Sequence, residues 1–232
     1  MLVKYWMNKE IVPIDVDASM ADARQIMKES RVALLPVLKK GKLVGVVSDR
    51  DLKRASASDA TTLDVHELTY LLSRIKVGDI MTQNPIAVPP DFTLEETASV
   101  LLNNRISGVP VLDADGKVLG VITQQDLFRA LISLSGFEKR GIQFAFQVED
   151  RAGSIKDVTD IIRQYGARLV SILTSYDRAP QGYRYLYVRA FGLDRRKMGQ
   201  LMDDLRDKAP ILYMVDHRDG TREEFIESNR TT

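Results

Sequence analysis

The sequence predicts an α/β protein built from two similar repeats, packed as one module about a pseudo-twofold axis, and a smaller β-α-β-β-α-β domain. Three observations predict it. Much of residues 7–51 recurs 74 or 75 positions later. In both copies a buried strand runs directly into a helix. Beyond residue 141, alternating apolar positions indicate strands, and two amphipathic helices separate them.

The two copies match in residue type at a nearly fixed spacing. The offset is 74 positions through the prolines and 75 positions after a one-residue insertion. Matched pairs are Met7 and Met81, Val12 and Ile86, Ser19 and Thr93, Pro36 and Pro110, and Asp51 and Asp126. A self-similarity of this length is a stronger indication of architecture than any single motif.

Composition shifts and turn residues set the expected boundaries. The expected segments are a first repeat (1–58), a helical connector (59–75), a second repeat (76–135), a hinge (136–141), a third domain (142–216) and a polar tail (217–232). In the third domain, strands are expected over 142–148, 167–176, 183–191 and 211–215, with helices over 155–165 and 194–208. This order is the ferredoxin-like, split βαβ pattern.

Helices in the repeats are expected over 20–30, capped by Ser19, and over 94–104 and 124–135. The connector holds a further expected helix over 64–74, and the tail a short one over 222–226. Strands are expected over 11–16, 32–38 and 43–47, and Asp113 to Gly116 form a hairpin turn in the second copy.

The strand-to-helix junctions carry the clearest chemistry. Ser48 and Thr123 occupy helix N-cap positions, and Asp51 and Asp126 follow three residues later. A hydroxyl, a carboxylate and free backbone N–H groups therefore converge where they suit a ribose and a phosphate. The same pattern also occurs as a helix cap that binds no ligand, so both interpretations stay open.

Both junctions resemble the CBS domain. The resemblance rests on Arg31 to Asp51, with Pro36, Gly41 and Gly45, and on Arg105 to Asp126, with Pro110, Gly116 and Gly120. It covers about the first 135 residues. A tandem pair in this family forms one regulatory module, often called a Bateman module. Such modules commonly bind adenosine compounds, so the resemblance implies AMP, ADP, ATP or S-adenosylmethionine as a regulatory ligand.

The resemblance also implies which residues line the clefts. In related modules the carboxylate and hydroxyl of one repeat complete a cleft lined by the other repeat. The implied groups are Thr123 and Asp126 with Val12 and Leu34, and Ser48 and Asp51 with Ile86 and Gly108. Arg50, which precedes Asp51, is expected either to meet a phosphate or to be a solvated arginine at a helix start.

The third domain resembles the ACT family at its first loop. The loop runs from Val148 to Ile155 and includes Asp150, Ala152, Gly153 and Ser154, with Ala152 where the family usually has proline. ACT domains are regulatory modules that often hold amino acids near this loop. A CBS pair followed by an ACT domain resembles bacterial regulatory proteins of the acetoin utilization, AcuB type.

Composition narrows the function classes. The net charge of +1, from 33 basic and 32 acidic residues, gives no basic field for nucleic acid. There are no cysteines, and the two histidines, His66 and His217, lie in different domains, so we expect no metal site. The first residues lack a signal-peptide pattern and no apolar run is long enough for a membrane span, so we expect a cytoplasmic protein.

Three function classes remain. The first is a non-catalytic sensor in which a nucleotide shifts the arrangement about the 136–141 hinge and signals to an unidentified enzyme or protein target. The second is a ligand-free dimerisation or scaffold protein. The third is an enzyme, which ranks last because no nucleophile and base are paired in the sequence. Both families tend to associate, so a homodimer is expected.

Overall fold

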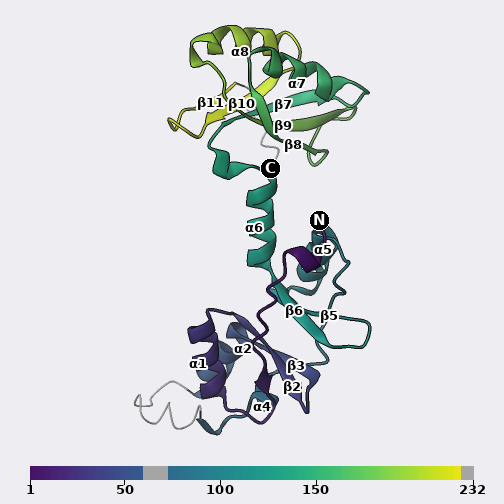
Figure 1. Cartoon of the computed structure of the whole chain (residues 1–232), viewed down its shortest axis with the longest axis vertical. Coiled ribbons are helices and arrows are strands. Elements are labelled where there is room, and N and C mark those ends of the chain that lie inside the picture. The colour runs from purple at the N-terminus through teal and green to yellow at the C-terminus, as the bar shows by residue number, and fades with distance from the viewer. Residues whose placement is uncertain (60–72, 226–232) are drawn as a thin grey trace. The chain divides into compact units, whose positions relative to one another are not determined.

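The computed structural model describes residues 1–59 and 73–225. It divides into two compact units, unit 1 (Met1–Phe128) and unit 2 (Arg129–Thr232), which we describe separately (Figure 1). The predicted connector helix falls mostly on residues 60–72, which also contain His66 and lie outside the described residues. None of the helices in the described part of the chain is long and apolar enough to cross a membrane.

The first repeat has the predicted helix over 20–30 and strands close to the predicted 32–38 and 43–47, whereas the strand expected over 11–16 is limited to residues 14–15 and η1 was not predicted. Its elements are η1 (Val3–Tyr5), β1 (Ile14–Asp15), α1 (Met20–Ser30), β2 (Leu34–Lys39), β3 (Lys42–Ser48) and α2 (Asp49–Asp59). Helix α1 begins at a reciprocal cap, because Ser19 Oγ accepts from Asp22 N at 3.1 Å and Asp22 Oδ2 accepts from Ser19 N at 3.0 Å. Its apolar face, with Met20, Ala23 and Met27, packs into the core of this repeat.

The second repeat copies the first in order and in capping. Its elements are α4 (Val77–Ile80), β4 (Thr82–Gln83), α5 (Leu94–Asn104), β5 (Gly108–Leu112), β6 (Val118–Thr123) and α6 (Gln124–Leu134). Thr93 and Glu96 cap α5 as Ser19 and Asp22 cap α1. Both helices also end on a left-handed arginine, Arg31 or Arg105, each with φ 54°. The duplication therefore extends to backbone conformation.

The two repeats exchange their N-terminal segments, which we call lead-ins (1–8 and 75–84). The first lead-in packs on the second repeat, where Leu2 bridges Thr93 and Asn8 bridges Val121. The second packs on the first repeat, where Lys76 bridges Ser19 and β4 pairs with β3. Strand β4 thereby completes the four-stranded sheet β1-β2-β3-β4. The first eight residues, which the sequence analysis assigns to the first repeat, therefore pack on the second repeat.

Two glycines make the exchange possible. A Cβ on Gly120 would lie 2.5 Å from Asn8 O and 2.9 Å from Met7 Sδ. A Cβ on Gly45 would lie 2.5 Å from Met81 Sδ and 2.9 Å from Thr82 O. Each lead-in thus lies against a strand position that has no room for a side chain.

Unit 2 is a sheet covered by two helices on one face (Figure 1). Its elements are η2 (Phe137–Lys139), β7 (Ile142–Glu149), α7 (Ser154–Gln164), β8 (Arg168–Ser175), β9 (Tyr183–Phe191), η3 (Arg195–Lys197), α8 (Met198–Arg206), β10 (Ile211–Asp216) and β11 (Arg222–Glu224). The antiparallel strands follow the order β11-β10-β7-β9-β8. The predicted β-α-β-β-α-β order is present, and Phe144, Phe146, Leu186 and Val188 pack beneath the helices.

The predicted hinge is a packed segment of unit 2. The carbonyl of Ser135 accepts from Arg189 Nε at 2.7 Å and from Ser171 Oγ at 2.8 Å. A Cβ on Gly141 would lie only 2.2 Å from Ala190 O. These residues are therefore bonded to the sheet of unit 2. The boundary between the two units falls earlier, between Phe128 and Arg129 within α6. The glycines of this segment permit its close packing against Val170 and Ala190.

The polar tail also differs from its prediction. Residues 222–224 form β11, which pairs with β10 through Val215 and Arg222, whereas a short helix was expected over 222–226. All three residues of β11 are exposed, so the hydrophobic alternation that identifies a strand in a sequence is absent.

Candidate functional site

The first strand-to-helix junction folds as a reciprocal cap. Asp51 Oδ2 accepts from Ser48 N at 2.9 Å and from Ser48 Oγ at 2.6 Å. The other carboxylate oxygen, Oδ1, accepts from Arg54 Nη2 at 3.1 Å. Asp51 is only 8% exposed, so the carboxylate lies buried where β3 passes into α2. The arrangement holds a negative charge and a hydroxyl at the N-terminus of a helix.

The second junction repeats this geometry. Asp126 Oδ2 accepts from Thr123 N at 2.7 Å and from Thr123 Oγ1 at 2.6 Å, where β6 passes into α6. Asp126 is 3% exposed. The four residues that the duplication singles out therefore form two equivalent caps, as the sequence predicts.

Strand register places two of the predicted lining residues beside these caps. Leu34 is the Cα partner of Ser48, and Gly108 is the partner of Thr123. A Cβ on Gly108 would lie 2.9 Å from Thr123 Cγ2, so a leucine would not fit there as it does in the first repeat. The two junctions share their polar groups and differ in the apolar residue beside them.

Comparison with known proteins identifies the module. The family model of the CBS domain matches residues 3–58 and again residues 77–133. A CBS domain-containing protein of Dictyostelium discoideum is 31% identical over 134 residues, and the match covers 57% of this chain and 92% of that protein. The chain belongs to the CBS-domain proteins. The two repeats of unit 1 are its CBS repeats.

Two further comparisons cover the same part of the chain. An uncharacterized protein of Methanocaldococcus jannaschii is 30% identical over 155 residues, with 57% of this chain and 92% of that protein covered. The crystal structure of the CBS domain NE2398 is 30% identical with a TM-score of 0.50, and the match covers 57% of this chain and 98% of that one. Both comparisons agree with the two CBS repeats.

The remaining lining residues occupy equivalent places in the two CBS repeats. Val12 precedes β1 and packs against the core of the first repeat, whereas Ile86 is 42% exposed. In the structure, Leu34 and Gly108 each lie beside the cap of their own repeat. The predicted clefts instead place each of them with the cap of the other repeat. The predicted grouping across the repeats stays a prediction.

Arg50 connects the two CBS repeats. Its Nη1 donates to the carbonyl of Arg105, at the end of α5, over 3.4 Å. The ion pairs of the described residues do not include Arg50, so its charge is available to an anion. The equivalent position in the second repeat holds Gln125. The junction at Ser48 therefore has a guanidinium that the junction at Thr123 lacks, and it also has the carboxylate of Asp49 where the second repeat has Gln124.

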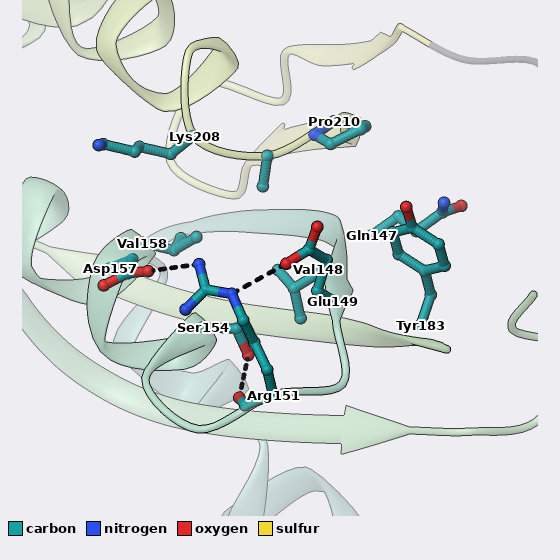
Figure 2. A pocket seen from close by; sticks show the side chains of 11 residues that line it. Gln147, Val148, Glu149, Arg151, Ser154, Asp157, Val158, Tyr183, Lys208 and Pro210 are labelled. Atoms are coloured by element: carbon teal, nitrogen blue, oxygen red, sulfur yellow. Dashed lines mark hydrogen bonds and ion pairs between the residues drawn. The ribbon is translucent and has the colours of Figure 1, made fainter. Parts of the chain in front are cut away.

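The predicted ACT loop lies between β7 and α7. Gly153 adopts φ +89° at the N-cap of α7, and buried Ser154 donates from Oγ to Arg151 O at 3.1 Å. Asp150 accepts from Tyr176 OH at 3.1 Å, and Ala152 is exposed. Of the four predicted residues, Ser154 alone lines the adjacent pocket, which measures about 240 Å³ (Figure 2).

This pocket contains charged side chains that the sequence analysis did not select. Arg151 Nε donates to Glu149 Oε2 and Nη2 donates to Asp157 Oδ2, each at 2.9 Å (Figure 2). The bonds to Asp157 and Glu149 raise the pKa of the Arg151 guanidinium. Lys208 approaches from the loop before β10. The sequence motif identifies the loop. It does not identify these side chains, because the direction in which they point depends on the tertiary fold.

Proposed function

We propose that this protein is a non-catalytic regulatory sensor that binds an adenosine nucleotide in the clefts of its CBS pair. The observation that carries the proposal is the pair of buried caps, Ser48 with Asp51 and Thr123 with Asp126. Each offers a carboxylate, a hydroxyl and helix N–H groups, which suit the ribose and phosphate of a nucleotide. AMP, ADP, ATP and S-adenosylmethionine share this adenosine part, so we propose one of them as the ligand.

Loss of either carboxylate is the direct test. We expect isothermal titration of the full chain with the four ligands to detect micromolar binding of at least one. Asp51→Ala or Asp126→Ala should weaken that binding by about tenfold or more, because a charged hydrogen-bonding group is lost from the cleft. The variant that loses binding then assigns the occupied cleft.

The cap at α1 provides a matched control. Asp22 bonds to Ser19 with the same atoms and nearly the same distances, at a junction outside the predicted clefts. Asp22→Ala should therefore remove a cap and leave nucleotide affinity unchanged. Equal loss in all three variants, or no binding of any of the four ligands to the wild-type chain, would contradict the proposal. The second outcome would favour the alternative, a ligand-free dimerisation or scaffold protein.

Arg50 should discriminate between ligands by charge. No ion pair of the described residues includes its guanidinium, which belongs to the residue before Asp51, so it could meet a phosphate at the Ser48 cap. We expect Arg50→Ala to weaken binding of ATP several-fold more than binding of adenosine, measured by titration calorimetry. Gln125→Ala, at the equivalent position of the second repeat, is the control. Equal weakening of ATP and adenosine by Arg50→Ala would exclude a phosphate contact.

We propose that unit 2 is an ACT-type regulatory domain that takes an amino acid at the β7–α7 loop. Its β-α-β-β-α-β order and the turn at Gly153 support this. The pocket beside Ser154 offers cations for a carboxylate and carboxylates for an ammonium group. Titration with the standard amino acids tests the proposal, and the absence of any heat of binding would argue against it.

We also propose a cytoplasmic homodimer that signals to a partner enzyme, in acetoin or central carbon metabolism. Helix α6 supports the association, because Leu131 and Ile132 of unit 2 are large apolar side chains that are 57% and 44% exposed. Light scattering gives the mass in solution. A monomer at micromolar concentration, or a dimer that Leu131→Glu leaves intact, would contradict association through this helix.

A further inference from the structure

Unit 2 contains a buried arginine with no anionic partner. Arg189 lies on β9 and is 4% exposed. Its Nε donates to Ser135 O at 2.7 Å and its Nη2 donates to Gln143 Oε1 at 2.6 Å, both uncharged acceptors. The remaining nitrogen, Nη1, is buried without a partner, and no ion pair of the described residues includes Arg189. Among the residues that the structure describes, no carboxylate therefore neutralises this buried positive charge.

A buried charge of this kind favours a nearby anion. Burial without a counter-ion is unfavourable, and Coulomb interactions are stronger in the protein interior than in water. Burial lowers the pKa of the Arg189 guanidinium, which reflects the same cost. An anion bound close to Arg189 would offset that cost, so the surroundings of this side chain are a place to look for a ligand site.

A pocket lies next to this charge. Phe137, Glu138, Arg140 and His217 line an open pocket of about 520 Å³. The ring of Phe137 lies close to both Arg189 and His217. Its centroid is 5.6 Å from Arg189 Cζ and 5.2 Å from the centroid of the His217 ring. His217 Nε2 is buried and has no hydrogen-bond partner among the described residues. The pocket thus combines an aromatic wall with the guanidinium of Arg140, and His217 brings a ring nitrogen that has no partner among the described residues.

We propose that this pocket binds a small organic oxyanion, a carboxylate or a phosphate ester with an apolar body. His217 Nε2 donates to the oxyanion, Arg140 supplies a paired charge, and Phe137 packs against the body of the ligand. The volume is that of a small-molecule site. The pocket shares no residue with the CBS caps or with the β7–α7 loop pocket, so the inference goes beyond the function proposed above.

Proton uptake should accompany binding. Burial, and then the charges of Arg189 and Arg222, lower the pKa of His217, while Asp216 opposes them. Glu138 and Arg140 are the other charged groups in the pocket. In the free protein the lowered pKa costs stability as the pH falls through about 6.5, because the unfolded chain takes up the proton first. A bound anion favours the imidazolium, so anion affinity should increase as the pH falls.

The test follows the His217 resonance of the full chain by NMR, with phenyl phosphate, benzoate and inorganic phosphate as probes. The resonance is assigned by its loss in His217→Gln. We expect phenyl phosphate or benzoate to raise the pKa of His217. We expect His217→Gln and Arg140→Gln each to weaken the bound probe about tenfold in calorimetry. Preference for one of these two probes identifies the ligand as a phosphate ester or a carboxylate.

Glu138→Gln is the matched variant, and it should change the affinity for an anion in the opposite direction. It removes the acidic side chain that lines the pocket among the described residues, so it should tighten binding of the anionic probe several-fold. An unchanged His217 resonance with all three probes would overturn the proposal, as would equal affinity in the wild type and in Arg140→Gln. Binding of inorganic phosphate alone would overturn the organic class of ligand. His217→Gln is also titrated with the nucleotides. Its nucleotide affinity should equal that of the wild type, so a failure of the anion proposal is distinguished from a failure of the CBS proposal.

Discussion

Replacing Gly141 with alanine is expected to destabilise unit 2 by about 3 kcal/mol. The new Cβ would lie 2.2 Å from the carbonyl oxygen of Ala190 and 2.9 Å from its carbonyl carbon. Both are backbone atoms of β9, so no side-chain rotation can relieve the contact. The start of β7 would have to move away from β9, which breaks the pairing of Ile142 with Ala190. The carbonyl of Gly141, which accepts from His217 N, would move as well.

Hydrogen exchange of the β7 and β9 amides measures this effect locally, and the thermal midpoint of unit 2 should fall by more than about 10 °C. Gly199→Ala is the matched control. Gly199 lies in α8 with nothing within 4 Å of an added Cβ, so the same change should stabilise the helix by about 0.5–1 kcal/mol. Unchanged exchange in Gly141→Ala would show that residues 136–141 are a free hinge after all.

Gly120→Ala is expected to cost unit 1 about 2 kcal/mol and to release the first lead-in. The added Cβ would lie 2.5 Å from Asn8 O, the backbone atom that accepts from Val121 N. Trp6, the only tryptophan of the chain, belongs to this lead-in. Its fluorescence should therefore change in the folded variant, and the amide of Val121 should exchange faster.

Gly45→Ala makes the same change at the equivalent site and should cost less, about 1 kcal/mol. There the nearest atom is Met81 Sδ, at the flexible end of a side chain, and the nearest backbone atom is Thr82 O at 2.9 Å. Urea unfolding of both variants gives the comparison. A larger loss of unfolding free energy in Gly45→Ala than in Gly120→Ala would contradict this prediction. It would mean that contact with the Met81 side chain costs more than the close approach to the backbone.

Much of the fold was predictable because its signals are local. The cap of α1 depends on residues three positions apart, and the structure has it as predicted. The equivalent cap of α5 follows from the duplication. The duplication then supplied a long-range inference, the equivalence of the Ser48 and Thr123 junctions. The β-α-β-β-α-β order followed from hydrophobic alternation, which Leu186 and Val188 show clearly in β9.

The features that were missed depend on contacts between distant residues. The sequence around Ser135 contains glycines and charges, which suggested a hinge, but Arg189 holds the carbonyl of Ser135 from 54 positions away. Strand β11 was missed because its side chains are polar, and only its pairing with β10 defines it. In the candidate sites, the capping residues of the two junctions were identified from the sequence. Arg151, Arg189 and His217 were not, because nothing in their neighbouring sequence indicates burial or a shared pocket.

The crossed lead-ins have a consequence for the origin of the module. The first repeat, expressed alone, would lack the strand β4 that completes its sheet, and its own lead-in would have no partner. Two such half-length chains could each supply the missing segment to the other and form a symmetric, swapped dimer. Duplication and fusion of a gene for that half would turn the exchange between chains into an exchange within one chain. Within the present chain, neither half can be lost without leaving the other incomplete.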